Sequence, residues 1–460
     1  MSTKHADSAK QFLYYKGSAQ WHNETLWFVR HKRDLVSRSL PEWETLRELS
    51  SQIKRHTISH LDTYLEQFAA NAEANGAIVH WAVDAKEHND IVFNILKKHK
   101  VRKVVKSKSM LTEECRLNPY LMARGIEVVE SDLGERILQL MDQAPSHIVL
   151  PAIHLKRQQV GKLFEEKLHT EKDNCDPTYL THAARKHLRQ EFLTADAAMT
   201  GANFGVAATG DVVVCTNEGN ADMGTSMAKL HIVSMGIEKV IPSYQSLGVF
   251  HRLLARSATG QPSTTYTSHY RKPQAGGEFH IVLVDNGRSK IAGNPDHWQT
   301  LKCLRCGACM NTCPVYRRSG GYSYTYFIPG PIGINLGMLQ APSRYFDNVS
   351  ACSLCFSCEN VCPAKIDLGH QIYKWRQDLN GLHKADPMKK YMSYGMKYVF
   401  KRPVVYHTGL KLAPAINKLP RFLIYNKLNA WGLGRELPQF AKESFSEMWK
   451  NNNVKSVKNE

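Results

Sequence analysis

Eight of the eleven cysteines fall in two runs with one shared spacing, Cys-x-x-Cys-x-x-Cys-x-x-x-Cys-Pro. The first run is Cys303, Cys306, Cys309 and Cys313, and the second is Cys352, Cys355, Cys358 and Cys362. Three thiolates separated by two residues can come from one tight loop, as a [4Fe–4S] cluster requires, while the fourth ligand arrives from elsewhere. Zinc also takes four thiolates, but zinc modules usually present them as two separate Cys-x-x-Cys pairs. The spacing therefore predicts two [4Fe–4S] clusters.

The pairing of the runs follows from a rule for two-cluster proteins, in which the fourth cysteine of each run ligates the other cluster. The first cluster is then expected on Cys303, Cys306, Cys309 and Cys362. The second is expected on Cys352, Cys355, Cys358 and Cys313. The three remaining cysteines are widely spaced and are expected to be packing residues, namely Cys115, Cys175 and Cys215.

Length and composition describe a large globular chain. Its 460 residues allow two or three domains, and 43% hydrophobic with 22% charged residues is typical of soluble proteins. The N-terminus lacks the apolar core of a signal peptide, and no long uncharged apolar run follows, so we expect a cytoplasmic protein without a transmembrane segment.

The formal net charge of +18 is concentrated near the C-terminus, where residues 381–460 hold 15 Lys or Arg and 5 Asp or Glu. Such a balance suits acidic protein partners or peripheral contact with an anionic membrane surface. No nucleic-acid motif has the required spacing, so no nucleic-acid partner is expected.

Four regions are predicted in chain order. Residues 1–75 are expected to be helical, since after Pro41 apolar residues recur at steps of three and four until Gly76. Residues 76–290 are expected to form an α/β domain, residues 291–380 an all-α two-cluster domain, and residues 381–460 a basic helical tail.

The α/β domain is predicted from alternating strands and helices, which favour a mostly parallel sheet. The strands are expected at 77–83, 103–105, 126–129, 147–150, 205–208, 211–215, 230–234, 264–268 and 280–284. The helices are expected at 86–100, 112–124, 155–169, 179–199 and 244–255. No Gly-x-Gly-x-x-Gly follows any predicted strand, so nothing indicates a dinucleotide site.

Weak candidates for an anion site lie in this domain. Lys106 and Lys108 follow a strand and precede a helix, where cations and free N–H groups can hold a carboxylate. An exposed basic turn is the simpler interpretation, because lysine is usually solvated. Glu218 stands beside Gly219 and is either a site residue or an ordinary turn residue.

The chain resembles the lactate utilization protein B family. The resemblance rests on the stretches 106–114, 216–220, 236–240 and 311–321 in addition to the cysteine runs. It implies an N-terminal domain similar to the sugar-phosphate isomerase and coenzyme A transferase α/β fold, followed by a two-cluster ferredoxin-like module. It also implies two companion subunits and the oxidation of L-lactate to pyruvate.

The sequence is compatible with three functions. In the first, the chain relays electrons through its clusters from a lactate-oxidising partner to an acceptor that the sequence does not identify. In the second, the α/β domain is itself a catalytic or carboxylate-binding unit and the clusters are accessory. In the third, only the basic charge supports a cluster-based regulator.

Overall fold

The computed structural model describes residues 5–14, 16–381, 387–425 and 438–451. The chain forms two compact units, Met1–Asp378 and Leu379–Glu460, which are considered separately below.

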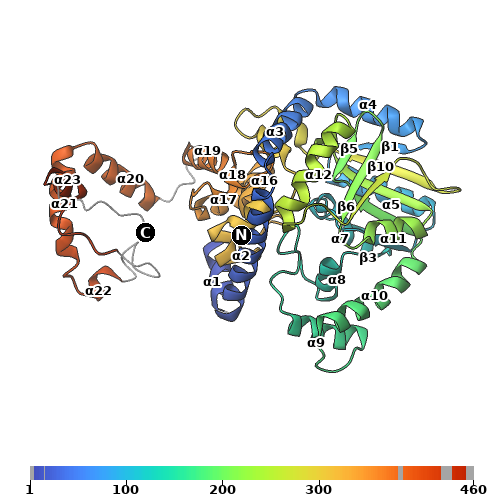
Figure 1. Cartoon of the computed structure of the whole chain (residues 1–460), viewed down its shortest axis with the longest axis horizontal. Coiled ribbons are helices and arrows are strands. Elements are labelled where there is room, and N and C mark those ends of the chain that lie inside the picture. Colours follow the sequence, from blue (N-terminus) through green and yellow to red (C-terminus); the bar gives the residue numbers. More distant parts are fainter. Residues whose placement is uncertain (1–4, 15, 382–386, 426–437, 452–460) are drawn as a thin grey trace. The chain divides into compact units, whose positions relative to one another are not determined.

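Six parallel strands form the main sheet of the first unit (Figure 1). Their order across the sheet is β1 (Ile78–Ala82), β10 (Glu278–Val284), β7 (Leu230–Gly236), β4 (Ala197–Gly201), β2 (Lys103–Lys106) and β3 (Glu127–Glu130). Alternate residues of the central strands enter two cores, as Ile232 and Val233 of β7 do, because both faces of a parallel sheet are covered. The predicted parallel α/β domain is confirmed.

Helices and a second, smaller sheet cover the two faces of the main sheet. Helices α5 (Ala85–Lys98), α6 (Met110–Glu114) and α7 (Leu117–Met122) pack on one face. The other face carries α4 (Leu61–Ala74), α10 (Pro177–Thr194) and a small sheet. The small sheet has the order β8 (Val240–Ile241), β5 (Phe204–Val206), β6 (Asp211–Thr216) and β9 (Tyr266–Tyr270), and helix α12 (Tyr244–Thr259) packs beside it.

One helix prediction and one strand prediction are wrong. The helix expected to reach Met199 ends at Thr194, and β4 begins at Ala197 in the middle of the sheet. The segment 147–150, expected as a strand, consists of bends. Its neighbour Ser146 donates its backbone N–H to Pro151 and accepts a hydrogen bond from the hydroxyl of Tyr316, so the loop packs on the cysteine module instead of a sheet.

Two predicted helices are each divided. The helix expected over 112–124 is split into α6 and α7 at Arg116, whose φ of 54° is left-handed. The helix expected after Pro41 is split into α3 (Trp43–Ser59) and α4 at His60, which leaves the helical conformation. Helices α8 (Leu133–Leu140) and α9 (Arg157–Leu168) follow, and only α9 was predicted.

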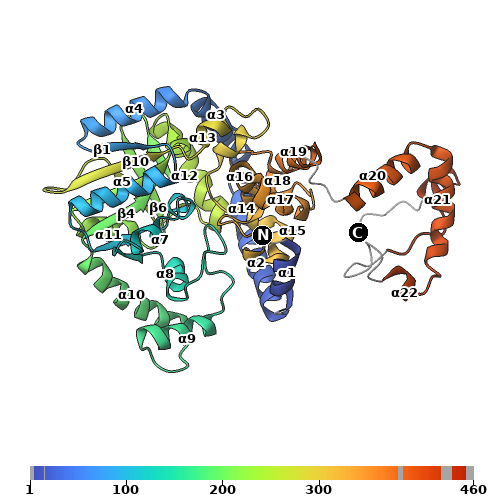
Figure 2. The same cartoon turned by 180° about the vertical axis from the view of Figure 1, so that it is seen from behind.

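The cysteine module is helical, as predicted. After α13 (Arg288–Ala292) come η2 (Trp298–Lys302), α14 (Ala308–Thr312), α15 (Pro314–Ser319), η3 (Tyr322–Tyr324), α16 (Gly330–Gln340), α17 (Pro342–Ala351), α18 (Ser357–Asn360) and α19 (Leu368–Gly381). Helices α1 (His5–Tyr14) and α2 (Lys16–Arg38) lie beside this module in both views (Figures 1 and 2) and pack on α14 and α15.

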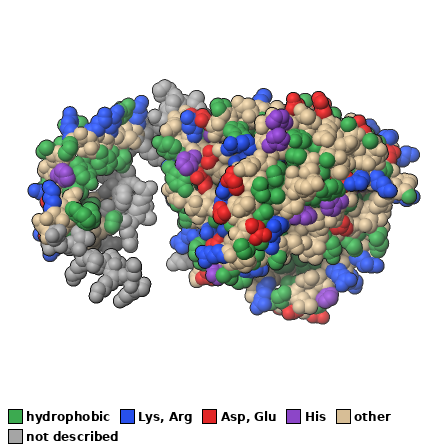
Figure 3. Space-filling model, turned by 45° about the horizontal axis from the view of Figure 1, so that its top comes forward, with side chains coloured by type: hydrophobic (Ala, Val, Ile, Leu, Met, Phe, Trp, Pro, Cys, Tyr) green, Lys and Arg blue, Asp and Glu red, His purple; other side chains and the backbone are tan. Residues whose placement is uncertain are grey.

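The second unit contains α20 (Pro387–Phe400), α21 (Pro403–Ile416), α22 (Arg421–Ile424) and α23 (Phe445–Lys450). Among its described residues no side chain of α21 or α23 is buried. Large apolar side chains such as Tyr391, Phe400 and Phe422 are exposed. Figure 3 shows hydrophobic side chains and Lys and Arg side chains together on the surface of this unit. This unit has little core of its own among the residues described.

Candidate metal centres and an adjoining cavity

The two cysteine runs fold into matching loops. The residues two and four places after the first cysteine have left-handed backbones in both runs: Arg305 and Gly307 follow Cys303, and Leu354 and Phe356 follow Cys352. Left-handed residues bend a chain sharply, which curls each loop so that its thiols can point inward.

Backbone N–H groups point at equivalent sulfur atoms in both runs. The N–H of Arg305 donates to Sγ of Cys303 at 3.4 Å, and the N–H of Leu354 donates to Sγ of Cys352 at 3.4 Å. The fourth thiols receive similar bonds, from Tyr316 to Cys313 at 3.5 Å and from Ile366 to Cys362 at 3.4 Å. Hydrogen bonds to sulfur stabilise thiolates and tune cluster potentials.

The thiols gather in two neighbouring groups that mix the runs. Burial, together with the nearby thiols of Cys362 and Cys303, raises the pKa of Cys306 to about 12. We call Cys303, Cys306, Cys309 and Cys362 the inner group. Burial likewise, together with the nearby thiols of Cys352 and Cys355, raises the pKa of Cys313 to about 11.

The outer group is Cys313, Cys352, Cys355 and Cys358. The pKa of Cys309, raised by burial first, also responds to Cys358, so the two groups are adjacent. Three cysteines of the inner group are buried, whereas Cys355 of the outer group is exposed. Bound metal would lower these thiol pKa values, because cluster ligands bind as thiolates.

The N-terminal helices hold the second cysteine run. Arg33 donates to the carbonyl of Val361 at 3.1 Å, and Arg47 donates to the carbonyl of Cys362 at 2.9 Å. Both guanidinium groups lie in the predicted N-terminal helical region, and they fix the loop that carries the fourth inner thiol. A sequence signal existed in principle, since Arg30 and Arg33 share a helix face three residues apart.

A cavity of about 300 Å³ lies between the carboxyl ends of the parallel strands and the inner group. The turn after β2, the end of β4 and the loop of Cys306 all line it. Gly201 ends β4 here, and a Cβ on it would come within 2.8 Å of the hydroxyl of Ser109. Only glycine therefore allows this strand and turn to approach so closely.

Lys106 does not line the cavity. Its side chain is fully buried in the sheet, and its ammonium group lies 2.8 Å from Glu130 and 3.8 Å from Glu113. Burial alone would lower the pKa of Lys106, but these carboxylates raise it above its ordinary value. Lys106 is therefore neither an exposed turn residue nor part of an accessible anion site.

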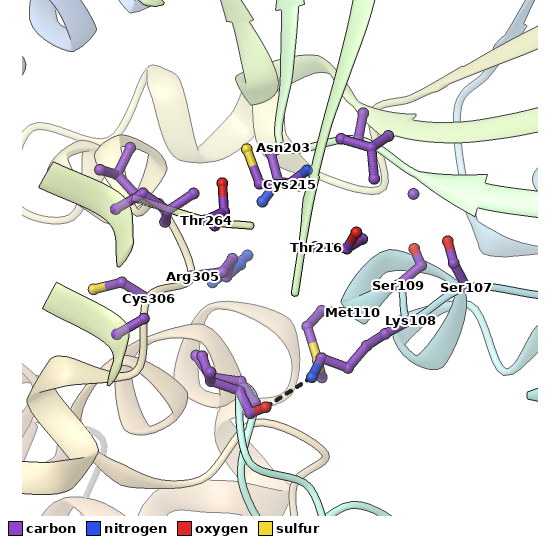
Figure 4. Close-up of a pocket in the computed structure, with 18 of the residues that line it drawn as sticks. Ser107, Lys108, Ser109, Met110, Asn203, Cys215, Thr216, Thr264, Arg305 and Cys306 are labelled. Carbon is purple, nitrogen blue, oxygen red and sulfur yellow. Dashed lines mark hydrogen bonds between the residues drawn. The ribbon is translucent and has the colours of Figure 1, made fainter. Parts of the chain in front are cut away.

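Lys108 and Glu218 both line the cavity. Lys108 donates to the carbonyl of Val149 at 2.8 Å and lies 3.5 Å from Asp132 (Figure 4). Glu218 is exposed at the rim, where its carboxylate accepts the N–H of Leu133 at 3.2 Å. Burial of this carboxyl group, and then the charge of Asp132, raise the pKa of Glu218.

Two cations at the cavity were missed from the sequence. Arg305 lies between Cys303 and Cys306, and its guanidinium points toward the middle of the cavity from the side opposite Lys108 (Figure 4). Lys239 follows β7, and burial lowers the pKa of its ammonium group. A cation inside a cysteine run was the available signal for Arg305.

The chain is similar to known proteins over most of its length. The chain matches the family model described as LUD domain over residues 65–291 and the model described as 4Fe-4S dicluster domain over residues 299–366. It is 40% identical to lactate utilization protein B of Oceanobacillus iheyensis over 423 residues, covering 89% of this chain and 88% of that protein. The chain belongs to the lactate utilization protein B family.

Other relatives of this family are similar over the same length. Lactate utilization protein B of Geobacillus thermodenitrificans is 41% identical over 90% of each chain. The electron transport protein YkgF of Escherichia coli is 38% identical over 91% of this chain and 90% of its own length.

The dicluster match implies iron–sulfur clusters, and the residues fit them. Two groups of four thiols converge from two loops, with backbone N–H groups aimed at the sulfur atoms. No helix among the described residues of this lactate utilization protein B family member is long and apolar enough to cross a membrane.

Proposed function

We propose that the chain is an electron-transfer subunit of a multi-subunit system that oxidises L-lactate to pyruvate. Its relatives named lactate utilization protein B and electron transport protein support this role. The observation that carries the proposal is the pairing of two four-thiol groups in one module. When bound, two [4Fe–4S] clusters would supply adjacent one-electron carriers.

The inner group would hold the first cluster, through Cys303, Cys306, Cys309 and Cys362. The outer group would hold the second, through Cys352, Cys355, Cys358 and Cys313. The exchange of fourth ligands is supported by the neighbours of each thiol, since Cys306 lies near Cys362 and Cys313 lies near Cys352.

The two groups differ in their access to solvent. The inner group is mostly buried and faces the cavity through Cys306. The outer group reaches the surface at Cys355, where a second protein can approach. We assign electron entry to the inner side and exit through the outer side, toward an acceptor that contacts the Cys355 surface.

Two companion subunits would supply the chemistry that the chain lacks. Oxidation of lactate removes two electrons and two protons, which requires a base near the hydroxyl and an acceptor such as a flavin or nicotinamide. The cysteine module offers electron carriers, and no dinucleotide fingerprint follows a strand.

Purified holo-protein alone should not reduce an artificial dye with L-lactate, and adding both companion subunits should restore lactate-dependent reduction. The reason is that the two-electron step takes place in a partner. Dye reduction measured anaerobically checks this, with D-lactate as the stereochemical control. Turnover by the isolated chain, free of partner protein, would contradict the relay and move the reaction into the α/β domain.

Deleting residues 381–460 should weaken binding to the companion subunits without removing iron. The unit presents exposed Tyr391, Phe400 and Phe422 among cationic side chains, a composition that suits a partner surface steered by charge. Co-purification at moderate salt, together with iron analysis, measures both effects. Complete co-purification of the truncated chain would assign the unit another task, such as contact with an anionic membrane surface.

A further inference from the structure

The cavity lies where parallel α/β sheets commonly bind ligands. From β2 the chain passes to β3 on one side and then returns to β4 on the other side of β2. This reversal makes the carboxyl ends of β2 and β4 a topological switch point, where a crevice opens beyond the sheet. Ser107 directly follows β2 and Gly201 is the last residue of β4, and both line the cavity.

Polar groups facing the cavity have no partner within the described residues. They are the hydroxyls of Ser107 and Thr216 and one terminal nitrogen, Nη1, of Arg305. Ser107 is only 4% exposed, so water outside the protein cannot satisfy it. A buried donor without a partner is costly, which indicates that something else fills its hydrogen bond.

Four cationic and four acidic side chains line the cavity, namely Lys108, Lys239, Arg288, Arg305, Glu114, Asp132, Glu218 and Glu238. Its acidic residues are largely used by neighbours: Glu114 lies 2.9 Å and Glu238 2.5 Å from Arg288, and Asp132 lies 3.5 Å from Lys108.

Two cations remain available to a ligand. Lys239 makes no ion pair among the residues that the structure describes, and Arg305 has only a long contact of 3.9 Å with Glu238. Glu218 stands at the exposed rim of the cavity, where its carboxylate accepts the N–H of Leu133.

We propose that this cavity binds a small carboxylate that carries an oxygen on its α-carbon, a 2-hydroxy or 2-oxo acid. Arg305 and Lys239 supply the charge for the carboxylate, and the hydroxyls of Ser107 and Thr216 supply hydrogen bonds to its oxygen atoms. A volume of about 300 Å³ is at the low end for ligand sites, which favours a small molecule over a dinucleotide. The cavity residues favour a small carboxylate, and the choice of 2-hydroxy and 2-oxo acids, with lactate and pyruvate as probes, rests on the proposed function.

The position of the cavity places the proposed site beside the inner thiol group. Cys306 belongs to the inner thiol group and lines the same cavity as Ser107 and Arg305. A bound acid would therefore lie next to the inner cluster site, and its negative charge would interact electrostatically with a cluster held there. The site is a sensor or docking point for substrate or product, distinct from the oxidation itself.

Equilibrium binding to anaerobic holo-protein tests the proposal, with L-lactate, pyruvate and propionate as probes in isothermal titration calorimetry. Pyruvate or lactate should bind saturably, and propionate, which lacks the α-oxygen, should bind more weakly. Lys239→Gln should weaken binding roughly tenfold through the loss of one charged partner. Thr216→Val, which removes only the hydroxyl, should reduce the preference over propionate.

The matched control is Lys272→Gln, which makes the same change at an exposed lysine outside the cavity and should leave binding unaltered. Iron content of each variant reports whether the cysteine module is intact. Absence of saturable binding by wild-type holo-protein, or equal binding by the Lys239→Gln and Lys272→Gln variants, would overturn the site.

Failure of this site and failure of the relay give different results. If the reconstituted complex reduces dye with lactate while the chain binds neither acid, the site is rejected and the relay stands. If the chain binds the acids but the complex passes no electrons through it, the relay is rejected and the site stands.

Discussion

Cys313→Ser should remove about half of the iron, roughly four of about eight atoms per chain, and should alter the same spectroscopic signal as Cys352→Ser. The physical reason is that Cys313, although it ends the first run, lies beside Cys352 and Cys355 of the outer group. Cys362→Ser should instead match Cys303→Ser, because Cys362 lies in the inner group. Iron analysis and electron paramagnetic resonance of reduced protein measure the losses.

Cys175→Ser is the matched control, since this half-buried cysteine lies in neither thiol group and should keep all the iron. A match between Cys313→Ser and Cys303→Ser would show that each run holds its own cluster, and the exchange of ligands would then be rejected.

Lys106→Met should lower the free energy of unfolding by about 3–5 kcal/mol, the typical cost of removing one partner from a buried ion pair. The change would leave Glu130 and Glu113 without their cation inside the protein. Urea unfolding followed by circular dichroism measures the loss.

Lys86→Met provides the control for Lys106. Lys86 lies 2.7 Å from Asp90, close to the 2.8 Å between Lys106 and Glu130, but its side chain is 83% exposed. An exposed pair contributes about 0–1 kcal/mol, so this variant should be nearly as stable as the parent. Equal losses in the free energy of unfolding from both variants would mean that burial does not increase the contribution of the Lys106 ion pair to stability.

The cysteine module was the most predictable part of the chain, because ligand spacing is a local property of the sequence. The left-handed residues and the helix starts lie at the same number of positions after Cys303 in the first run as after Cys352 in the second. The parallel sheet was also predictable in outline, from alternating apolar strands and amphipathic helices.

Strand β4 could not be predicted in the same way. Its sequence, Ala197 to Gly201, lacks β-branched residues apart from Thr200, and it continues a helical pattern without a visible stop. Pairing with β2 and β7 makes it a strand, and pairing between distant segments leaves no local signal.

The cavity residues show the same limit. Lys106 and Lys108 differ by two residues and follow one strand, yet the first is enclosed by carboxylates and the second lines the cavity. Arg305 and Lys239 meet there although they are 66 positions apart in the sequence. Tertiary contacts decide these roles, so a single sequence could give candidates and not their surroundings.

The contact between Arg47 and the carbonyl of Cys362 joins residues 315 positions apart. During synthesis the first helices leave the ribosome long before the last cysteine, so they cannot dock until the second run has emerged. Contacts that close so large a loop form late and slowly. Completion of the inner thiol group therefore coincides with fixing the N-terminus, and a nascent chain that stops short of Cys362 exposes both its thiols and its first helices.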